Sequence, residues 1–559
     1  MKDFELKILG DSYMAGPISD IKINPEGEPN AKLWLIGDAP GFDDLRFQRP
    51  FIGASGQLLR ETLRRHGKGM TASGTIAIDA QLVDVYVTYV CNYRPLDGDF
   101  SLLKDTWQLS DGILELKKAI NEYKPNCIIT LGDAALSTLC GKYGAYNHNA
   151  SILPSLAQYG STKVVACLSP NKVLGSEGDT PLFDFAIRRG VEQSEFADIR
   201  YEPRDIRIDP TQSDIEELFA AKELVVDIEN IKHKTTIRCI AFSPRDSVGI
   251  CFNYNQTNYK TIVDLLGSGI PLIFHNGVHD VTVNQLEGNV VTNYFDDTII
   301  RAHILDPELP RSLAVLNYLY TTWPYYKTGG TEDNDIKGWS TKKSTEELLE
   351  YCAKDVISTR RIWSEQQSEF TPDLLNLHAQ EMKVQRMAVA LGHRGLLVDE
   401  ERRSILSDLA TKKIKFYLNQ FWNLAKKEVN PGSPKQVCEF LYDDLGLPVR
   451  KNRKTGGRTS DEDALVSLLQ HCSGKLLTLK TDKARQEWSI KLAILKVLLI
   501  LREWLKVKSS YIDITLHDGK AKSTWKVPGT ETGRWSAANF CDSSGLNLQT
   551  LPRGGIESE

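Results

Sequence analysis

The stretch Glu223-Leu224-Val225-Val226-Asp227-Ile228-Glu229 joins an apolar run to two acidic residues at its end. Its aliphatic and β-branched residues favour a buried strand. Side chains two residues apart in a strand point to the same face, so Asp227 and Glu229 face the same way. Both carboxylates can therefore converge on one metal ion. The stretch predicts a metal-binding strand at the start of an α/β unit that runs to about residue 369.

Two further acidic motifs follow this strand. Pro271-Leu272-Ile273-Phe274 predicts another strand, with Asp280 shortly after it. Ser344-Thr345-Glu346-Glu347 is typical of a capping box that opens a helix, and on that helix Tyr351 and Asp355 share one face. Together the motifs supply four carboxylates and a tyrosine hydroxyl. Hard oxygen ligands of this kind suit Mg²⁺ or Mn²⁺, and two such ions can stabilise the attacking and leaving oxygens of a phosphodiester.

The order of these motifs resembles the proofreading 3′→5′ exonuclease domain of the DnaQ-like superfamily, and Asp296-Asp297-Thr298 matches the middle segment of that family. The resemblance implies an RNase H-like fold and two Mg²⁺ or Mn²⁺ ions. It implies that Asp227, Glu229 and Asp355 hold the first ion, and that Asp227 and Asp280 hold the second. Tyr351, with Glu229, would orient the attacking water.

Two positions depart from the exonuclease pattern. Asn230 follows the first motif, where a threonine-bearing context is usual, and His279 precedes the acidic residue where an aromatic ring is common. Neither change removes a metal ligand. We therefore expect an active 3′-5′ DNA exonuclease.

Size and composition set the frame for the rest of the chain. At 559 residues, three or four domains are expected. The net charge of -5 neither indicates nor excludes nucleic-acid binding. The 10 cysteines include no Cys-x-x-Cys pair, and no apolar run opens the chain, so a cytoplasmic protein with reduced thiols is expected. The longest apolar stretch, 492–505, contains Lys496 and Arg502 and does not predict a membrane span.

Short apolar strands alternate with helical patterns between about residues 31 and 195, which predicts an α/β sandwich. Gly37-Asp38-Ala39-Pro40-Gly41 and the segment 50–59 resemble the uracil-DNA glycosylase superfamily, and Phe51 would stack on a base. The family's uracil-binding Asn is replaced by Tyr89, and Ser169-Pro170-Asn171 stands in place of its His-Pro-Ser. Cysteine ligands for an iron–sulfur cluster are missing. The resemblance thus implies a non-catalytic domain that contacts DNA or protein.

The C-terminal third resembles the thumb and the first palm segment of family-A DNA polymerases (the polymerase I type). The resemblance lies in residues 381–399, in 430–448, in Thr532-Gly533-Arg534 and in Asn547-Leu548-Gln549-Thr550-Leu551-Pro552. Long helical patterns are expected over 374–427 and 482–508. Lysines and arginines in these segments can contact DNA phosphates. Hydrogen-bond donors of the protein can also contact the acceptor atoms that every base pair presents in the minor groove, and can so check the pairing geometry. The residues expected to bind DNA are Arg502, Lys506, Thr532, Arg534, Asn547 and Gln549.

No palm carboxylate motif and no fingers helix follow these residues. The leading hypothesis is therefore the exonuclease-bearing subunit of a split replicative polymerase of phage type, which grips primer-template while a second polypeptide supplies palm and fingers. Alternatives are a stand-alone 3′-5′ exonuclease with a vestigial thumb, a DNA-binding or processivity module, and a gene fragment. The expected architecture is multidomain α/β and α, divided into an irregular segment 1–30, a glycosylase-like domain 31–195, an exonuclease domain 205–372 and a thumb with incomplete palm 373–559.

Overall fold

The computed structural model describes residues 17–68, 82, 84–231, 234–326, 345–452 and 456–551. The chain forms two compact units, residues 1–386 with 527–535 and residues 387–526 with 536–559, and each is described by itself. The first 16 residues of the segment predicted to be irregular lie outside the described residues, as does Ser344 of the predicted capping box. Within the described ranges, no helix is both long and apolar enough to span a membrane.

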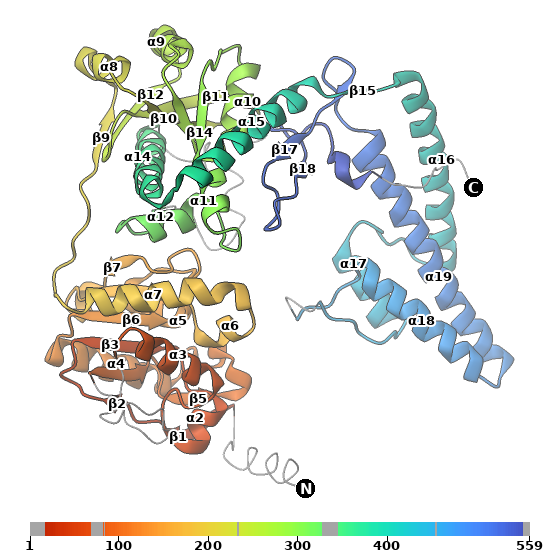
Figure 1. The fold of residues 1–559 in the computed structure, drawn as a ribbon. Helices are drawn as coiled ribbons and strands as arrows, with labels where there is room; N and C mark the ends of the chain where they lie inside the picture. Colours follow the sequence, from red (N-terminus) through yellow and green to blue (C-terminus); the bar gives the residue numbers. More distant parts are fainter. Residues whose placement is uncertain are drawn as a thin grey trace. The chain divides into compact units, whose positions relative to one another are not determined.

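The first unit begins with a six-stranded sheet, called here the N-terminal sheet, in the order β2-β4-β3-β6-β8-β7. Figure 1 shows this region in red to orange, with β2, β3, β6 and β7 labelled. Its four inner strands are parallel, and β2 and β7 pair antiparallel at the edges. The strands of this region are β1 Ile18–Lys22, β2 Glu26–Gly27, β3 Leu33–Gly37, β4 Val85–Tyr89, β5 Tyr93–Pro95, β6 Cys127–Leu131, β7 Ile152–Pro154 and β8 Lys163–Cys167. The helices are α2 Phe42–Phe47, α3 Ala54–Arg65, α4 Trp107–Tyr123, α5 Asp133–Cys140, α6 Pro170–Leu174 and α7 Thr180–Gln193.

Alternation along β3 divides the core of this region into two layers. Leu33 and Leu35 pack in one buried cluster with residues of α3 and α7, whereas Trp34 and Ile36 pack in another with residues of α4 and α5. A strand buried on both faces needs apolar residues at every position, and β3 meets that requirement with Leu-Trp-Leu-Ile. The α/β sandwich predicted from the sequence is therefore present. The described part of segment 1–30, which was predicted to be irregular, contains the short strands β1 and β2. Strand β1 pairs with β5, and β2 pairs with β4.

A second six-stranded sheet, called here the central sheet, has the order β14-β13-β10-β11-β12-β9. Strands β10, β11 and β12 form an antiparallel meander, while β13 and β14 continue parallel to β10. The strands are β9 Asp205–Ile208, β10 Leu224–Asn230, β11 Ile237–Ser243, β12 Val248–Asn253, β13 Leu272–Phe274 and β14 Tyr294–Asp297. The helices are α8 Gln212–Phe219, α9 Gln256–Gly267, α10 Val278–Leu286, α11 Thr298–Leu305, α12 Leu313–Tyr320, α14 Thr345–Glu369 and α15 Pro372–Arg394.

Helix α14 covers one face of the central sheet, where it packs against Val225, Cys239, Ala241, Cys251 and Ile273. Gly249 on β12 allows the close approach of this helix. A Cβ atom at Gly249 would lie 2.6 Å from the carbonyl oxygen of Ala353. The helix therefore lies close to the same sheet face that carries Asp227 and Glu229.

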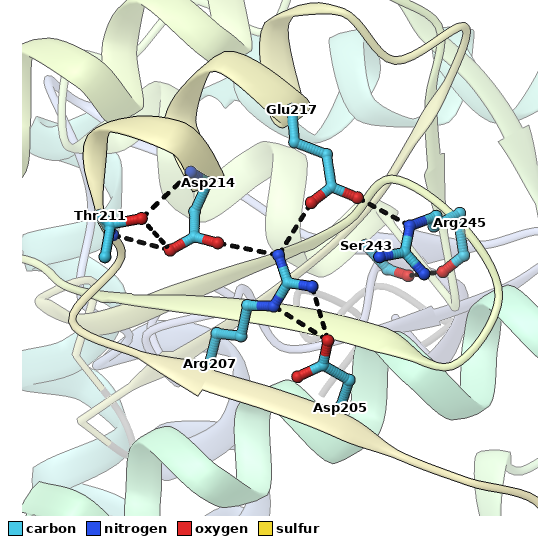
Figure 2. A network of polar contacts seen from close by, with 7 residues as sticks. All are labelled: Asp205, Arg207, Thr211, Asp214, Glu217, Ser243 and Arg245. Atoms are coloured by element: carbon cyan, nitrogen blue, oxygen red, sulfur yellow. Dashed lines mark hydrogen bonds and ion pairs between the residues drawn. The ribbon is translucent and has the colours of Figure 1, made fainter.

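The edge strand β9 is tied to α8 by a network of charges (Figure 2). The Arg207 guanidinium donates to Asp205 at 2.6 Å and to Asp214 and Glu217 at 2.8 Å. Thr211 caps α8, and its hydroxyl and backbone N–H both donate to Asp214. The hydrogen bonds that Arg207 donates to the carboxylates of Asp205, Asp214 and Glu217 raise its pKa above the ordinary value, although burial opposes the rise. The network stabilises the edge of the sheet at β9, which is separated from β10 and its acidic residues by β11 and β12.

The second unit is mainly helical. Its buried core includes Phe421 of α16, Leu465 and Leu468 of α18, and Leu495 and Leu498 of α19. Its helices are α16 Glu400–Ala425, α17 Pro434–Cys438, α18 Glu462–Thr478 and α19 Asp482–Val507, with π-helical turns at Glu439–Asp444 and Lys508–Ile512. Its short strands are β15 Leu396–Leu397, β16 Lys520–Ala521, β17 Thr524–Lys526 and β18 Ser536–Ala538, which pair antiparallel as β15–β16 and β17–β18.

The helical pattern predicted over 374–427 is interrupted once. Helix α15 ends before Gly395, which adopts a left-handed φ of 60°, and Asp399 then caps α16 by accepting from the N–H of Arg402. A Cβ atom at Gly395 would lie 2.9 Å from the carbonyl oxygen of Ala521, so glycine meets both a conformational and a steric requirement. The predicted combination of α/β and helical parts is confirmed by the fold.

Candidate active site

The candidate site lies at the carboxyl end of β10. Asp227 and Glu229 are on the face covered by α14, where Asp227 lies opposite Ala241 and Glu229 lies opposite Cys239 on β11. The pairing shifts register between Glu229 and Asn230, which ends the regular ladder directly after the second carboxylate. Both side chains are half-buried and retain access to solvent.

Helix α14 brings a third carboxylate to this pair. Carboxylate oxygens of Asp227, Glu229 and Asp355 all lie within 4.8 Å of one another. Asp355 is buried, with 4% of its surface exposed. Three negative groups at such spacing repel one another unless a cation or a proton lies between them. The donor set consists of oxygen atoms alone, which fits a hard divalent cation such as Mg²⁺ or Mn²⁺.

Asp280, in the first turn of α10, lies beside this group. Its carboxylate accepts a hydrogen bond from the backbone N–H of Ile228 at 3.2 Å, between the two acidic residues of β10. Burial raises the pKa of Asp280 to about 7, and the charges of Asp297 and Asp355 add to the rise. Because its pKa lies close to neutral pH, the Asp280 carboxyl can release its proton when a cation binds there.

Tyr351 lies one helical turn before Asp355 on α14. Burial raises the pKa of its phenol well above the usual value, and the charges of Asp355, Glu229 and Asp227 reinforce the shift. The phenol therefore stays protonated and can donate a hydrogen bond. The structure thus brings together, around β10 and α14, all five residues that the sequence predicted for this site.

Tyr326 is a member of the site that the sequence analysis missed. Its hydroxyl donates to Oδ1 of Asp355 at 2.5 Å, and its ring lies 5.9 Å from that of Tyr351 in an edge-on arrangement. The Arg204 guanidinium stacks on Trp323 at 4.1 Å and lies 5.3 Å from the centre of the Tyr326 ring. The hydroxyl of Tyr326 thus fixes the orientation of the Asp355 carboxylate in the acidic cluster. Residues 321–326 contain no regular helix or strand, so no periodic pattern marked this position.

The loop that leads into α10 is held by Asp297. Its carboxylate accepts from the backbone N–H groups of Asn276 and Gly277, each at 2.8 Å, and from the hydroxyl of Tyr294. Gln385 donates to the same carboxylate at 3.2 Å. The acidic pair 296–297, noted in the sequence as a family match, therefore has a supporting role: Asp297 fixes the start of the helix that carries Asp280.

The N-terminal sheet carries a second, contrasting site. Phe51 and Tyr89 stack with ring centres 4.7 Å apart, and both are largely buried, with 6% and 2% exposed. The Tyr89 hydroxyl donates to Asp44 at 2.7 Å and accepts from the N–H of Phe51 at 2.9 Å. A Cβ atom at Gly37 would lie 2.6 Å from the Phe51 ring. Tyr89 thus covers one face of the Phe51 ring, and the stacking of Phe51 on a base stays a prediction.

The predicted DNA-binding residues fall in both compact units. Thr532 and Arg534 lie on an exposed turn grouped with the first unit, where the N–H of Arg534 donates to the Thr530 hydroxyl. In the second unit, Asn547 caps a short 3₁₀ helix (Leu548–Thr550), and Oε1 of Gln549 accepts from the N–H of Ala537 at 3.0 Å.

Arg502 has an intramolecular role that the sequence prediction did not include. Its guanidinium donates to the carbonyl oxygens of Pro431 and Ser460, and burial lowers its pKa. Lys506, on the same helix, is exposed. Of these two cations, Lys506 is thus the one with its side chain directed to solvent.

Two segments of the chain match known protein families. Residues 25–186 match the uracil DNA glycosylase superfamily, and residues 210–370 match the 3'-5' exonuclease family of A-type DNA polymerases. The DNA polymerase I of Pseudomonas aeruginosa is 29% identical over 46% of this chain and 26% of its own length. The DNA polymerase I of Synechocystis sp. is 25% identical over 52% of this chain and 28% of its own length. The chain thus spans about a quarter of the length of the curated relatives it matches.

A solved POL domain of Pol1 from M. smegmatis, in complex with DNA primer-template and dNTP, aligns at a TM-score of 0.41 and 19% identity, over 64% of this chain and 57% of that chain. The family matches confirm two predictions made from the motifs. The chain carries a uracil-DNA-glycosylase-like domain followed by a 3′-5′ exonuclease domain of the kind found in family-A DNA polymerases.

Proposed function

We propose that the chain removes nucleotides from the 3′ ends of DNA by two-metal hydrolysis. The observation that carries the proposal is the convergence of Asp227, Glu229 and Asp355 within 4.8 Å at the end of β10. When bound, two Mg²⁺ or Mn²⁺ ions would supply a Lewis acid for the phosphodiester and a bound water of lowered pKa.

The roles of the side chains follow from their positions. Asp227, Glu229 and Asp355 would hold the first ion, and Asp227 with Asp280 the second. The protonated phenol of Tyr351 would donate a hydrogen bond that orients the attacking water, with Glu229 accepting from the same water. Tyr326 keeps Asp355 in position through its 2.5 Å hydrogen bond. Positioning of this kind contributes to rate because the groups need no rearrangement during the reaction.

The direct test is digestion of a single-stranded DNA labelled at its 5′ end. With Mg²⁺ or Mn²⁺ present, we expect a ladder of shortened products that keep the label, since removal starts at the 3′ end. A chelator should abolish the ladder, and Asp227→Asn should fail to produce it at equal protein concentration. Intact substrate in the presence of either metal would refute the proposal.

We also propose that the chain works with palm and fingers carried by another polypeptide, as the exonuclease subunit of a replicative polymerase. The support is the pair of polymerase-like motifs at 532–534 and 547–552, together with the similarity to DNA polymerase I of two bacteria. In this proposal, segment 373–559 grips primer-template through Lys506, Thr532, Arg534, Asn547 and Gln549. The fused glycosylase-like domain is the reason for proposing a phage-type enzyme that acts in the cytoplasm.

Nucleotide incorporation tests this second proposal. We expect no primer extension by the chain alone with primer-template, Mg²⁺ and all four nucleotides. Extension should appear on addition of a polypeptide that carries palm and fingers and co-purifies with this chain. Metal-dependent incorporation by the pure chain would refute the divided arrangement and would leave the exonuclease proposal untouched.

A further inference from the structure

Three cysteines meet in the interior of the central sheet. Cys239 on β11, Cys251 on β12 and Cys352 on α14 have sulfur atoms within 4.8 Å of one another. All three side chains are buried, with 1%, 0% and 0% exposed. Among the residues that the structure describes, this is the one group of three or more cysteines at such a spacing.

The strand register explains why the thiols gather beside the carboxylates. Cys239 lies directly opposite Glu229, whereas Ala241 lies opposite Asp227 on one side and opposite Cys251 on the other. Residues opposite each other in a sheet share a face. The thiols and the acidic residues of β10 therefore occupy one sheet face, which α14 covers.

Cys352 is the point at which the two groups touch. Its sulfur lies 3.5 Å from the carbonyl oxygen of Asp227 and 3.7 Å from Oδ2 of the same residue, so its single S–H proton can be donated to either oxygen. Cys352 also precedes Asp355 by three residues, so both project from neighbouring turns of α14. A change in the position of Cys352 therefore acts on Asp227 directly.

Three thiols in mutual contact form a donor set of a different class from the oxygen site. Sulfur ligands about 2.3 Å from a tetrahedral Zn²⁺ stand roughly 3.8 Å apart, within the spread of the three sulfur atoms. Thiolates prefer soft cations, while carboxylates prefer Mg²⁺ and Mn²⁺. Two neighbouring sites can therefore select different metals.

We propose that Cys239, Cys251 and Cys352 form a thiolate site for a soft divalent cation such as Zn²⁺ or Cd²⁺, and that filling this site inhibits the exonuclease. Binding replaces the three thiol protons, which pass to solvent. Cys352 then no longer donates to Asp227 and is drawn toward the cation. Asp227 loses a partner that fixes its orientation, so it holds the catalytic ions less well. The inhibition part of this inference rests on the proposed exonuclease function, whereas the binding part does not.

The test is a titration of the full chain with Cd²⁺ in a large excess of Mg²⁺, which keeps the oxygen site supplied. Cadmium–thiolate bonds give an ultraviolet charge-transfer band. We expect the band to saturate at one equivalent in the wild type and to disappear in Cys251→Ala, which leaves the Cys352 thiol that contacts Asp227 in place. Cys251→Ser serves as a second variant if the first is not folded by circular dichroism. Cys140→Ala, in a buried cluster of the N-terminal sheet, is the matched control and should keep the band.

Exonuclease rates measured in the same samples test the coupling. One equivalent of Cd²⁺ should lower the rate at least about tenfold in the wild type and in Cys140→Ala, in the range of losses seen when a partner of a metal ligand is removed. The same addition of Cd²⁺ should change the exonuclease rate of Cys251→Ala by no more than about twofold relative to that variant without Cd²⁺. A wild-type band no larger than that of Cys251→Ala overturns the site, and a saturating band without inhibition overturns the coupling. If the wild type without Cd²⁺ digests no DNA, the exonuclease proposal fails, while the band still decides whether the thiolate site exists.

Discussion

The two α/β regions of the first unit handle their candidate sites in opposite ways. In the central sheet, Asp227 and Glu229 stay half-buried, and their carboxylate oxygens converge with those of Asp355 to within 4.8 Å. In the N-terminal sheet, the ring of Tyr89 packs on Phe51 and its hydroxyl is bonded at both ends. An arrangement of like charges left in place costs stability unless a ligand binds there, whereas a packed ring adds stability without one. The contrast is between an acidic cluster that can accept a cation and a packed aromatic pair that stabilises its own sheet.

The largest expected effect comes from removing the Tyr89 ring, which stacks on Phe51. Tyr89→Ala should lower the local stability of the N-terminal sheet by about 3–5 kcal/mol, as for other buried rings replaced by alanine. Tyr89→Phe keeps the ring and should cost about 1–2 kcal/mol, through the lost hydrogen bond to Asp44. Hydrogen exchange of the peptides that contain β3 and β4 measures both. Equal protection in Tyr89→Ala and wild type would break the comparison, because the ring would then not be a structural element.

A second expected effect is a pH dependence centred on Asp38. Burial raises the pKa of this carboxyl to about 6, and its Oδ1 accepts from the N–H of Ala135. Since the folded pKa lies above the unfolded value of about 4, the folded state holds the extra proton, and its stabilisation is lost as pH rises through about 6. Asp38→Asn keeps the acceptor and removes the titration. Between pH 4.5 and 8, exchange protection of β3 should fall by roughly 1–3 kcal/mol in the wild type only.

A third prediction concerns the acidic cluster of the central sheet. Tyr326→Phe removes the hydrogen bond that fixes Asp355 and should lower the exonuclease rate about 10- to 100-fold, as for other partners of metal ligands. The loss should be smaller at high Mn²⁺ or Mg²⁺, since weaker metal binding is its cause. Tyr254→Phe is the matched control, because its hydroxyl bonds Asn289 in the same domain. Equal rates in both variants and the wild type would show that Tyr326 does not position the site.

The smallest expected effect lies at the sheet edge in Figure 2. Arg207→Gln breaks the bonds to Asp205, Asp214 and Glu217, and it should lower exchange protection of β9 by about 1 kcal/mol because the network is partly exposed. The effect should shrink at high salt. The exonuclease rate of Arg207→Gln should match that of the wild type. Arg200→Gln is the control, because it removes an exposed ion pair with Asp198, and its rate should also match the wild type. A large fall in rate for Arg207→Gln would show that edge and site are coupled, contrary to their separation in the sheet.

The sequence allowed the acidic side chains to be grouped because two simple periods apply. Alternation in a strand puts Asp227 and Glu229 on one face, and the helical repeat puts Tyr351 and Asp355 on another. Tyr326 could not be predicted in the same way, since it lies in irregular chain and acts through a contact 29 residues away. The thiol group likewise depends on the pairing of β10, β11 and β12, which no local pattern specifies.

The C-terminal part shows a similar division. The pattern over 482–508 matches α19, whose ends are Asp482 and Val507, because a long helix is decided by its own residues. The break at Gly395 depends on the close approach of residue 521, far along the chain. Arg502 gives the same lesson for function, because only the folded structure shows that its donors bond the carbonyl oxygens of Pro431 and Ser460.

The anchored ring of Tyr89 also bears on the history of the glycosylase-like domain. A change of Tyr89 to the asparagine of the related enzymes would leave a cavity, break two hydrogen bonds and still leave Ser169-Pro170-Asn171 without the histidine of that family. Exchange of Tyr89 for asparagine alone therefore carries a folding cost and leaves the histidine position unchanged. The packed ring makes position 89 costly to change, because its side chain supports both the stack on Phe51 and the hydrogen bond to Asp44.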